Sequence, residues 1–187
     1  MPVPDPVVVS ATFLRPSAPG PADIATEVVR AGRRVATGEA RLVQSGKEIV
    51  RAVATFADLD QASDRVHVRS QPPVRVPLPR AAQLGRRPGE PGARSALLAA
   101  VPRRHAADLF ALAAMVDAAA PAVLELGVQG SATIELTVHL RAKPAPGWLA
   151  CRAFTRHAIG EYHDEDFEIW DSTGALVAQS RQFALLL

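Results

Sequence analysis

The 187-residue sequence contains a single cysteine, Cys151, and only five histidines. One cysteine excludes an internal disulfide and a thiolate cluster for a structural metal, so we expect Cys151 to be a buried strand residue. The histidines do not have the HExxH spacing of a zinc peptidase. The net charge of +2 is small and the arginines are scattered, which does not indicate a nucleic-acid partner. We therefore expect no metal, no cofactor and no nucleic acid.

The chain also lacks a recognisable signal peptide and the run of about 20 apolar residues that a bilayer-spanning helix needs. We therefore expect a cytoplasmic protein without membrane insertion. Hydrophobic residues make up 48% of the sequence, which is ample for a packed core. The length allows one large domain or two small ones.

The segment HAADLFALAAMVDAAAPAVLELG, residues 105–127, predicts one almost wholly apolar helix. Alanine, leucine and methionine are strong helix formers, Asp108 suits the positive end of the helix dipole, and Pro121 ends the run. Apolar residues cover every side between Leu109 and Ala120, which is typical of a helix buried all round.

Asp117 is the exception near the far end of this segment. Helical spacing gives it the same stripe as Phe110, Ala113 and Ala114, which we expect to be core residues. A carboxylate is unfavourable at the negative end of the helix dipole, and burying it without a partner costs far more. Two interpretations remain open. Asp117 reaches solvent at the helix end, or it lies in a pocket with donors or water.

The sequence contains an internal repeat. FLRPSAPG (residues 13–20) returns as HLRAKPAPG (139–147), and SGKEIVRAVATFA (45–57) returns as STGALVAQSRQFA (172–184). Each half therefore predicts four strands, with a Pro-Gly turn after the first and a glycine-containing turn before the last. We expect residues 1–57 and 131–187 to form one antiparallel sheet of about eight strands.

Seven of the sixteen prolines lie between residues 58 and 102. We assign residues 1–57 to a partial first repeat, 58–94 to a linker rich in proline, glycine and arginine, and 95–187 to the second repeat. SALLAAV, residues 95–101, predicts a strand that leads into the apolar helix.

Four segments carry a family resemblance: FLRPSAPGPADI, LFALAAMVDAAAPAVLELG, ATIELTVHLRAKPAPGWL and DSTGALVAQSRQFALL. The sequence resembles the TesB-like acyl-CoA thioesterases, which have a double-hotdog fold. The resemblance implies an α+β protein whose antiparallel sheet wraps a long central helix. Only MPVPDP precedes the first strand, so the leading strand and helix of the first hotdog are expected to be absent.

The resemblance implies an acyl-CoA thioesterase that hydrolyses a fatty acyl-CoA by attack of a water molecule. It assigns Asp117, Thr133 and Gln182 to holding and activating that water. Strand alternation supports Gln182, because it shares a small, mostly apolar face with residues such as Ala184. Strict alternation turns Thr133 to the opposite face, unless a bulge at the strand start reverses it.

Two other functions remain open, a non-catalytic acyl-CoA-binding protein and an assembly subunit. Val7 and Thr55 stand where the second half has Thr133 and Gln182, so we expect at most one active site. The uncovered first half and the tendency of sheet edges to pair predict a homo-oligomer. The polar run HDED, residues 163–166, is interpreted as the solvated face of a strand.

Overall fold

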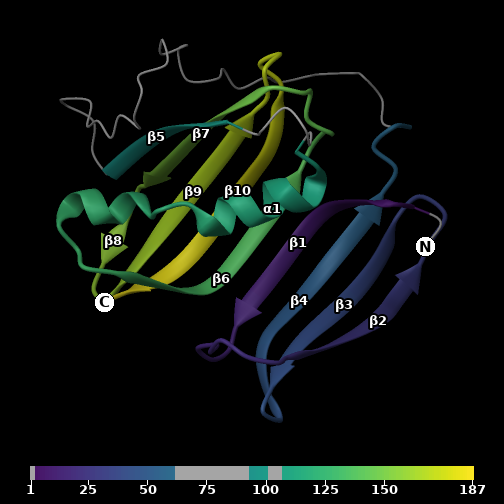
Figure 1. Ribbon diagram of the computed structural model, residues 1–187, viewed down its shortest axis with the longest axis horizontal. Coiled ribbons are helices and arrows are strands. Elements are labelled where there is room, and N and C mark those ends of the chain that lie inside the picture. Colours follow the sequence, from purple (N-terminus) through teal and green to yellow (C-terminus); the bar gives the residue numbers. More distant parts are fainter. Residues whose placement is uncertain (1–2, 62–92, 101–106) are drawn as a thin grey trace.

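The computed structural model describes residues 3–61, 93–100 and 107–187, and for residues 93–100 only the backbone is considered. One antiparallel sheet contains all ten strands of these residues, in the order β2-β3-β4-β1-β6-β10-β9-β7-β5, with β8 paired to β9 (Figure 1). The elements along the chain are β1 (Asp5–Phe13), β2 (Asp23–Ala31), β3 (Ala36–Gln44), β4 (Lys47–Ala57), β5 (Ala93–Ala100), α1 (Leu109–Ala118), the 3-10 helix η1 (Ala122–Leu126), β6 (Ser131–Leu140), β7 (Trp148–Thr155), β8 (Ala158–Ile159), β9 (Tyr162–Trp170) and β10 (Leu176–Leu186).

The sheet consists of two halves with the same strand order. From the centre outward one half runs β1, β4, β3, β2, and the other runs β6, β10, β9, β7. The halves join through the antiparallel pair β1–β6, in which Val9 lies opposite Val138 and Ala11 opposite Leu136. The predicted continuous sheet from residues 1–57 and 131–187 is therefore confirmed, as is the strand predicted near residues 95–101, which is β5. Most of the expected linker, residues 62–92, lies outside the described residues.

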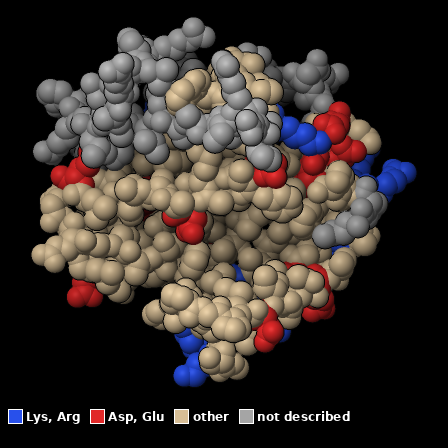
Figure 2. Space-filling model, viewed as in Figure 1, with Lys and Arg blue, Asp and Glu red and all other residues tan. Residues whose placement is uncertain are grey.

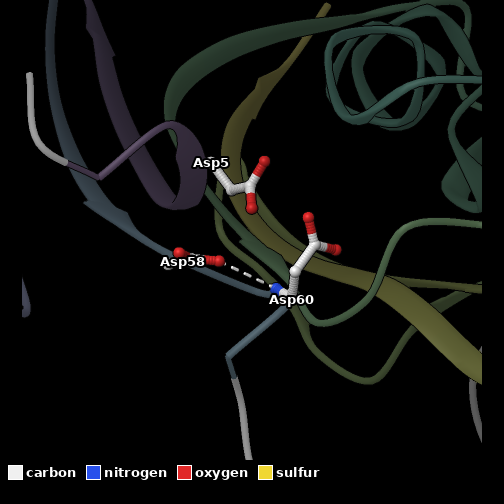
Figure 3. A group of neighbouring side chains, drawn as sticks. All are labelled: Asp5, Asp58 and Asp60. Atoms are coloured by element: carbon white, nitrogen blue, oxygen red, sulfur yellow. Dashed lines mark hydrogen bonds between the residues drawn. The ribbon is translucent and has the colours of Figure 1, made fainter.

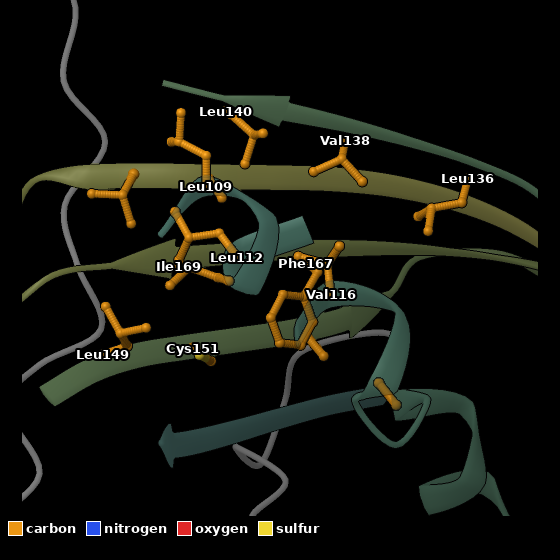
Figure 4. Close-up of a cluster of buried hydrophobic side chains, with 14 residues drawn as sticks. Leu109, Leu112, Val116, Leu136, Val138, Leu140, Leu149, Cys151, Phe167 and Ile169 are labelled. Atoms are coloured by element: carbon orange, nitrogen blue, oxygen red, sulfur yellow. The ribbon is translucent and has the colours of Figure 1, made fainter. Parts of the chain in front are cut away.

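The core lies between α1 and one face of the second half. Leu109, Leu112 and Val116 are buried at helical spacing and contact the sheet (Figure 4). Burying a side chain of this size stabilises the fold by about 1.5–3 kcal/mol. The other buried members of the cluster are Ala122, Leu136, Val138, Leu140, Leu149, Cys151, Ala153, Phe167, Ile169, Val177 and Ala178. Cys151 is thus a buried strand residue, as predicted.

The apolar segment does not form the single long helix that the sequence predicted. α1 ends at Ala118, Ala119 has extended backbone angles, and Pro121 is the N-cap of the separate helix η1. Asp108 is the N-cap of α1, and its side chain accepts a hydrogen bond of 2.7 Å from the amide of Ala111. By composition and length, Leu109–Leu126 has the mean hydropathy of a membrane span, 1.8 over 18 residues, but the fold divides it into two helical pieces.

α1 is buried on one side only, so the prediction of a helix buried all round is wrong. Phe110 is 70% exposed, and Ala114 and Asp117 are exposed as well. The stripe that the sequence assigned to the core therefore faces outward. A helix that packs on one sheet needs only one apolar stripe against it, and here the stripe of Leu112 and Val116 fills that position.

The first half presents the corresponding sheet face without a helix among the described residues. Ile24 is 71% exposed on β2, and Val28 on the same strand is exposed too. Figure 2 shows this side of the molecule as largely uncharged, with a hollow between α1 and strands β1–β4.

Candidate active site

Gln182 is a buried amide on the face of the sheet that α1 covers. It lies on β10 opposite Leu136 of β6, a member of the core cluster, and opposite Glu165 of β9. The residue is 7% exposed, and its side chain makes no hydrogen bond with any residue that the structure describes. A buried amide normally has partners, so these donors and acceptors are available to water or a ligand.

Thr133 lies on this same face because β6 contains a bulge. β10 is regular here, but the register passes from Phe183 opposite Glu135 to Ala184 opposite Thr133, which leaves Ile134 as an extra residue. Ala184 is fully buried on the α1 side, and its cross-strand partner shares that side. Strict alternation is therefore wrong for Thr133, and the bulge makes it a diagonal neighbour of Gln182.

Asp117 is near the end of α1 on its exposed stripe. It makes no hydrogen bond or ion pair with the residues that the structure describes. The fold thus brings Thr133 and Gln182 together but gives Asp117 no direct contact with either. Of the two interpretations left open, the geometry agrees with a carboxylate that reaches solvent.

The interpretation of the HDED run as the solvated face of a strand is wrong, because the run is largely buried. His163 is 1% exposed and Glu165 is 3% exposed, and both lie on the α1 face of β9. Asp164 and Asp166 point to the other face, as strand alternation requires. Nε2 of His163 lies 2.7 Å from the hydroxyl oxygen of Ser131. These groups extend the polar patch around Gln182. The sequence feature nearest to this finding is strand alternation, whose period of two residues places His163 and Glu165 on one face.

Glu165 is the acid of this patch. Its carboxylate accepts a hydrogen bond from the backbone amide of Ala122, at the start of η1. Burial raises the pKa of Glu165 to about 7, the charge of Asp166 adds to the rise, and the Ala122 amide opposes it. Burial also raises the pKa of the Cys151 thiol to about 12, so this thiol stays neutral.

The opposite face of the sheet carries a depression of about 340 Å³, lined in part by Glu135, Tyr162, Arg181 and Phe183. The rings of Tyr162 and Phe183 stack with centroids 5.4 Å apart. The guanidinium of Arg181 donates to the carboxylate of Asp164 at 2.6 Å, so this cation is already paired with a neighbouring acid. Gln182 and His163 are also among the residues that line this depression.

Asp5, Asp58 and Asp60 form a group of neighbouring carboxylates beside the junction of the two halves (Figure 3). The ammonium of Lys143 lies 2.6 Å from Asp60 and 3.3 Å from Asp5. Asp58 accepts from the amides of Asp60 and Gln61 at 3.0 and 3.2 Å. Lys143 thus pairs with two of the three carboxylates and Asp58 caps a turn, so the arrangement is that of an ion pair and a turn.

Comparison with known families gives two matches along the chain. The acyl-CoA thioesterase C-terminal domain matches residues 51–186, and the acyl-CoA thioesterase N-terminal domain matches residues 1–57. The uncharacterized proteins Rv0499 of Mycobacterium tuberculosis and Mb0510 of Mycobacterium bovis are each 31% identical over 226 aligned residues. These alignments cover 99% of this chain and 77% of the relatives.

Solved structures agree in fold. A protein from Thermobifida fusca superposes with a TM-score of 0.84 at 31% identity, over 98% of this chain and 79% of that one. The acyl-CoA thioesterase II TesB2 of Mycobacterium marinum gives 0.76 at 21% identity, over 98% and 80%. A protein of Alicyclobacillus acidocaldarius with a hotdog fold gives 0.81 at 21% identity, over 98% and 79%. The fold described above is therefore a hotdog fold, an antiparallel sheet with one α-helix among the described residues.

Proposed function

Because the chain belongs to the acyl-CoA thioesterase family, we propose that it hydrolyses the thioester bond of a fatty acyl-CoA. A water oxygen adds to the thioester carbonyl carbon, the carbon–sulfur bond breaks, and the thiolate of CoA leaves and takes up a proton. The products are a fatty acid and free CoA.

The buried amide of Gln182, which has no hydrogen-bond partner among the described residues, is the observation that carries this proposal. Its N–H groups are able to donate to the oxygen that gains negative charge in the transition state. The hydroxyl of Thr133, one strand away on the same face, is a second group for orienting the water. Asp117 accepts the proton of the water in this proposal, since its carboxylate has no partner among the residues that the structure describes.

The direct test is incubation of the purified protein with acyl-CoA thioesters of increasing chain length, with detection of the free thiol of CoA. Release of thiol above the spontaneous rate supports the proposal. Acyl-CoA binding without thiol release supports instead the second candidate, a non-catalytic acyl-CoA-binding protein. The exposed position of Asp117 favours this second candidate.

Replacement of Thr133 by valine tests the hydroxyl while keeping the shape of a β-branched strand residue. We expect turnover to fall by about 2- to 10-fold, the value of one neutral hydrogen bond. Steady-state thiol release measures the change. Thr137→Val is the matched control, because Thr137 lies on the same strand but bonds Ser10 and Glu135 on the other face. Equal losses in the two variants would contradict a role for the Thr133 hydroxyl.

We further propose that residues 1–57 and 95–187 are two hotdog repeats and that the protein self-associates. The matching strand orders of the two halves support the first point. The exposed Ile24 and Val28, and the fully exposed edge strand β2, support the second. Light scattering is expected to give a mass above the 19.8 kDa of one chain. A monodisperse monomer over a range of protein concentrations would refute self-association.

A further inference from the structure

We propose that Glu165 is a positioning residue of this site, holding the start of η1 against the sheet beside Gln182. The inference rests on the proposed function. Its basis is the hydrogen bond from the Ala122 amide to the Glu165 carboxylate, together with the pairing of Glu165 with Gln182 across β9 and β10.

The hydrogen bond compensates two groups that are costly to bury alone. Glu165 is 3% exposed and Ala122 is fully buried, so neither group reaches bulk water. An unpaired amide or carboxylate at such a place costs free energy, and a bond between them is charge-assisted when the acid is ionised. The N-cap of η1 is Pro121, which has no side-chain oxygen. Glu165 of strand β9 supplies the missing acceptor.

The held segment connects two residues assigned to the site. Asp117 lies just before the end of α1, Ala122 begins η1, and Thr133 is the third residue of strand β6 beyond it. The Glu165–Ala122 bond therefore fixes one point of the connection between Asp117 and Thr133. It fixes that connection relative to Gln182, because Glu165 and Gln182 are cross-strand partners. A small displacement of reacting groups lowers turnover steeply, by as much as about 10²-fold for 1 Å.

Several titratable groups lie on the elements around Glu165. They are His163 and Asp166 on β9, Glu125 on η1, Asp117 on α1 and Cys151 on β7; β6 and β10 bring only uncharged side chains to this face within the described residues. The cross-strand partner of Glu165 is Gln182, a site residue whose side-chain amide carries no charge. Comparing variants of Glu165 with variants of Asp117 therefore distinguishes the effect of the Glu165 charge from the effect of the Asp117 charge.

The experiment compares Glu165→Ala and Glu165→Gln with wild type. Glutamine keeps a carbonyl acceptor for the Ala122 amide, whereas alanine removes it. We expect Glu165→Ala to lower kcat by about 10-fold or more with little change in KM, and Glu165→Gln to restore most of the loss. Hydrogen exchange at the Ala122 amide is expected to accelerate in Glu165→Ala and to stay near wild type in Glu165→Gln. The matched control is Asp171→Asn, a buried acid that accepts from the amides of Ala145 and Ala175 at the far end of β9.

The pH profile of kcat, unlike the pH dependence of stability, is a readout that a merely structural contact would not alter. The pKa of Glu165 is raised from 4.5 to about 7 in the fold, so ionisation of the buried acid opposes folding. Its contribution to stability is therefore greatest at low pH and falls as pH rises from about 4.5 through about 7. Glu165→Gln is expected to raise the melting temperature relative to wild type more at pH 8 than at pH 5. It is also expected to remove a limb near pH 7 from the profile of kcat.

The outcomes separate this inference from the proposed function. Wild-type turnover and unchanged Ala122 exchange in Glu165→Ala would overturn the positioning role. If wild type releases no thiol, the proposed function fails, and the exchange of Ala122 still decides whether Glu165 holds η1. If Glu165→Ala does not fold, Glu165→Gln decides: loss of the limb near pH 7 supports the role, and an unchanged limb contradicts it.

Discussion

Replacement of Asp117 by asparagine is expected to lower turnover by about 10²- to 10⁴-fold, the usual contribution of a positioned general base. Asparagine has nearly the same shape but is unable to take the proton of the attacking water. Acyl-CoA binding is expected to persist, because the change leaves the apolar surface of α1 as it is. Thiol release and acyl-CoA binding measured on the same preparation check both expectations.

Stability separates a catalytic Asp117 from a structural one. Asp117 is exposed near the C-terminal, negative end of α1, so removing its charge is expected to leave the melting temperature unchanged or slightly higher. Wild-type turnover with normal melting would remove Asp117 from the mechanism. Lost turnover with a collapsed melting temperature would identify a structural acid. Asp108→Asn is the control on the same helix, because asparagine caps a helix about as well as aspartate.

Replacement of Gln182 by alanine is expected to lower turnover by about 10²- to 10³-fold, the value of one well-placed donor to a developing oxyanion. The amide has no partner among the residues that the structure describes, so its removal breaks no internal hydrogen bond there. We therefore expect the effect to appear in kcat, with a modest change in melting temperature from the lost packing. Kinetics with the acyl-CoA that wild type hydrolyses fastest measure it.

The control for Gln182→Ala is Gln179→Ala on the same strand. Gln179 points to the other face, where its side-chain oxygen accepts a hydrogen bond of 3.0 Å from Arg141. This variant is expected to keep wild-type turnover. If Gln182→Ala behaves like Gln179→Ala, the amide is not a donor to the reacting atoms. If Gln182→Ala binds acyl-CoA normally and hydrolyses it slowly, the amide acts in the transition state rather than in binding.

The sequence by itself determined the sheet and the facing of Gln182. Its repeat predicted two similar sets of four strands, and these are the sets β1–β4 and β6, β7, β9 and β10. Strand alternation has a period of two residues that depends only on local backbone geometry, so it gave Gln182 the face that α1 covers. The same local rule separated His163 and Glu165 from Asp164 and Asp166.

Tertiary structure alone decided three other features. The bulge at Ile134 reverses the facing of Thr133, because a shift of one residue moves a strand residue to the opposite side of the sheet. The packed side of α1 was undetermined, since a helix that is apolar all round carries no periodic signal for one face. The burial of Glu165 depends on Ala122, which is distant in sequence and supplies the hydrogen bond that makes a buried acid tolerable. Partners from distant segments meet only when the chain has folded, and no local pattern around Glu165 specifies them.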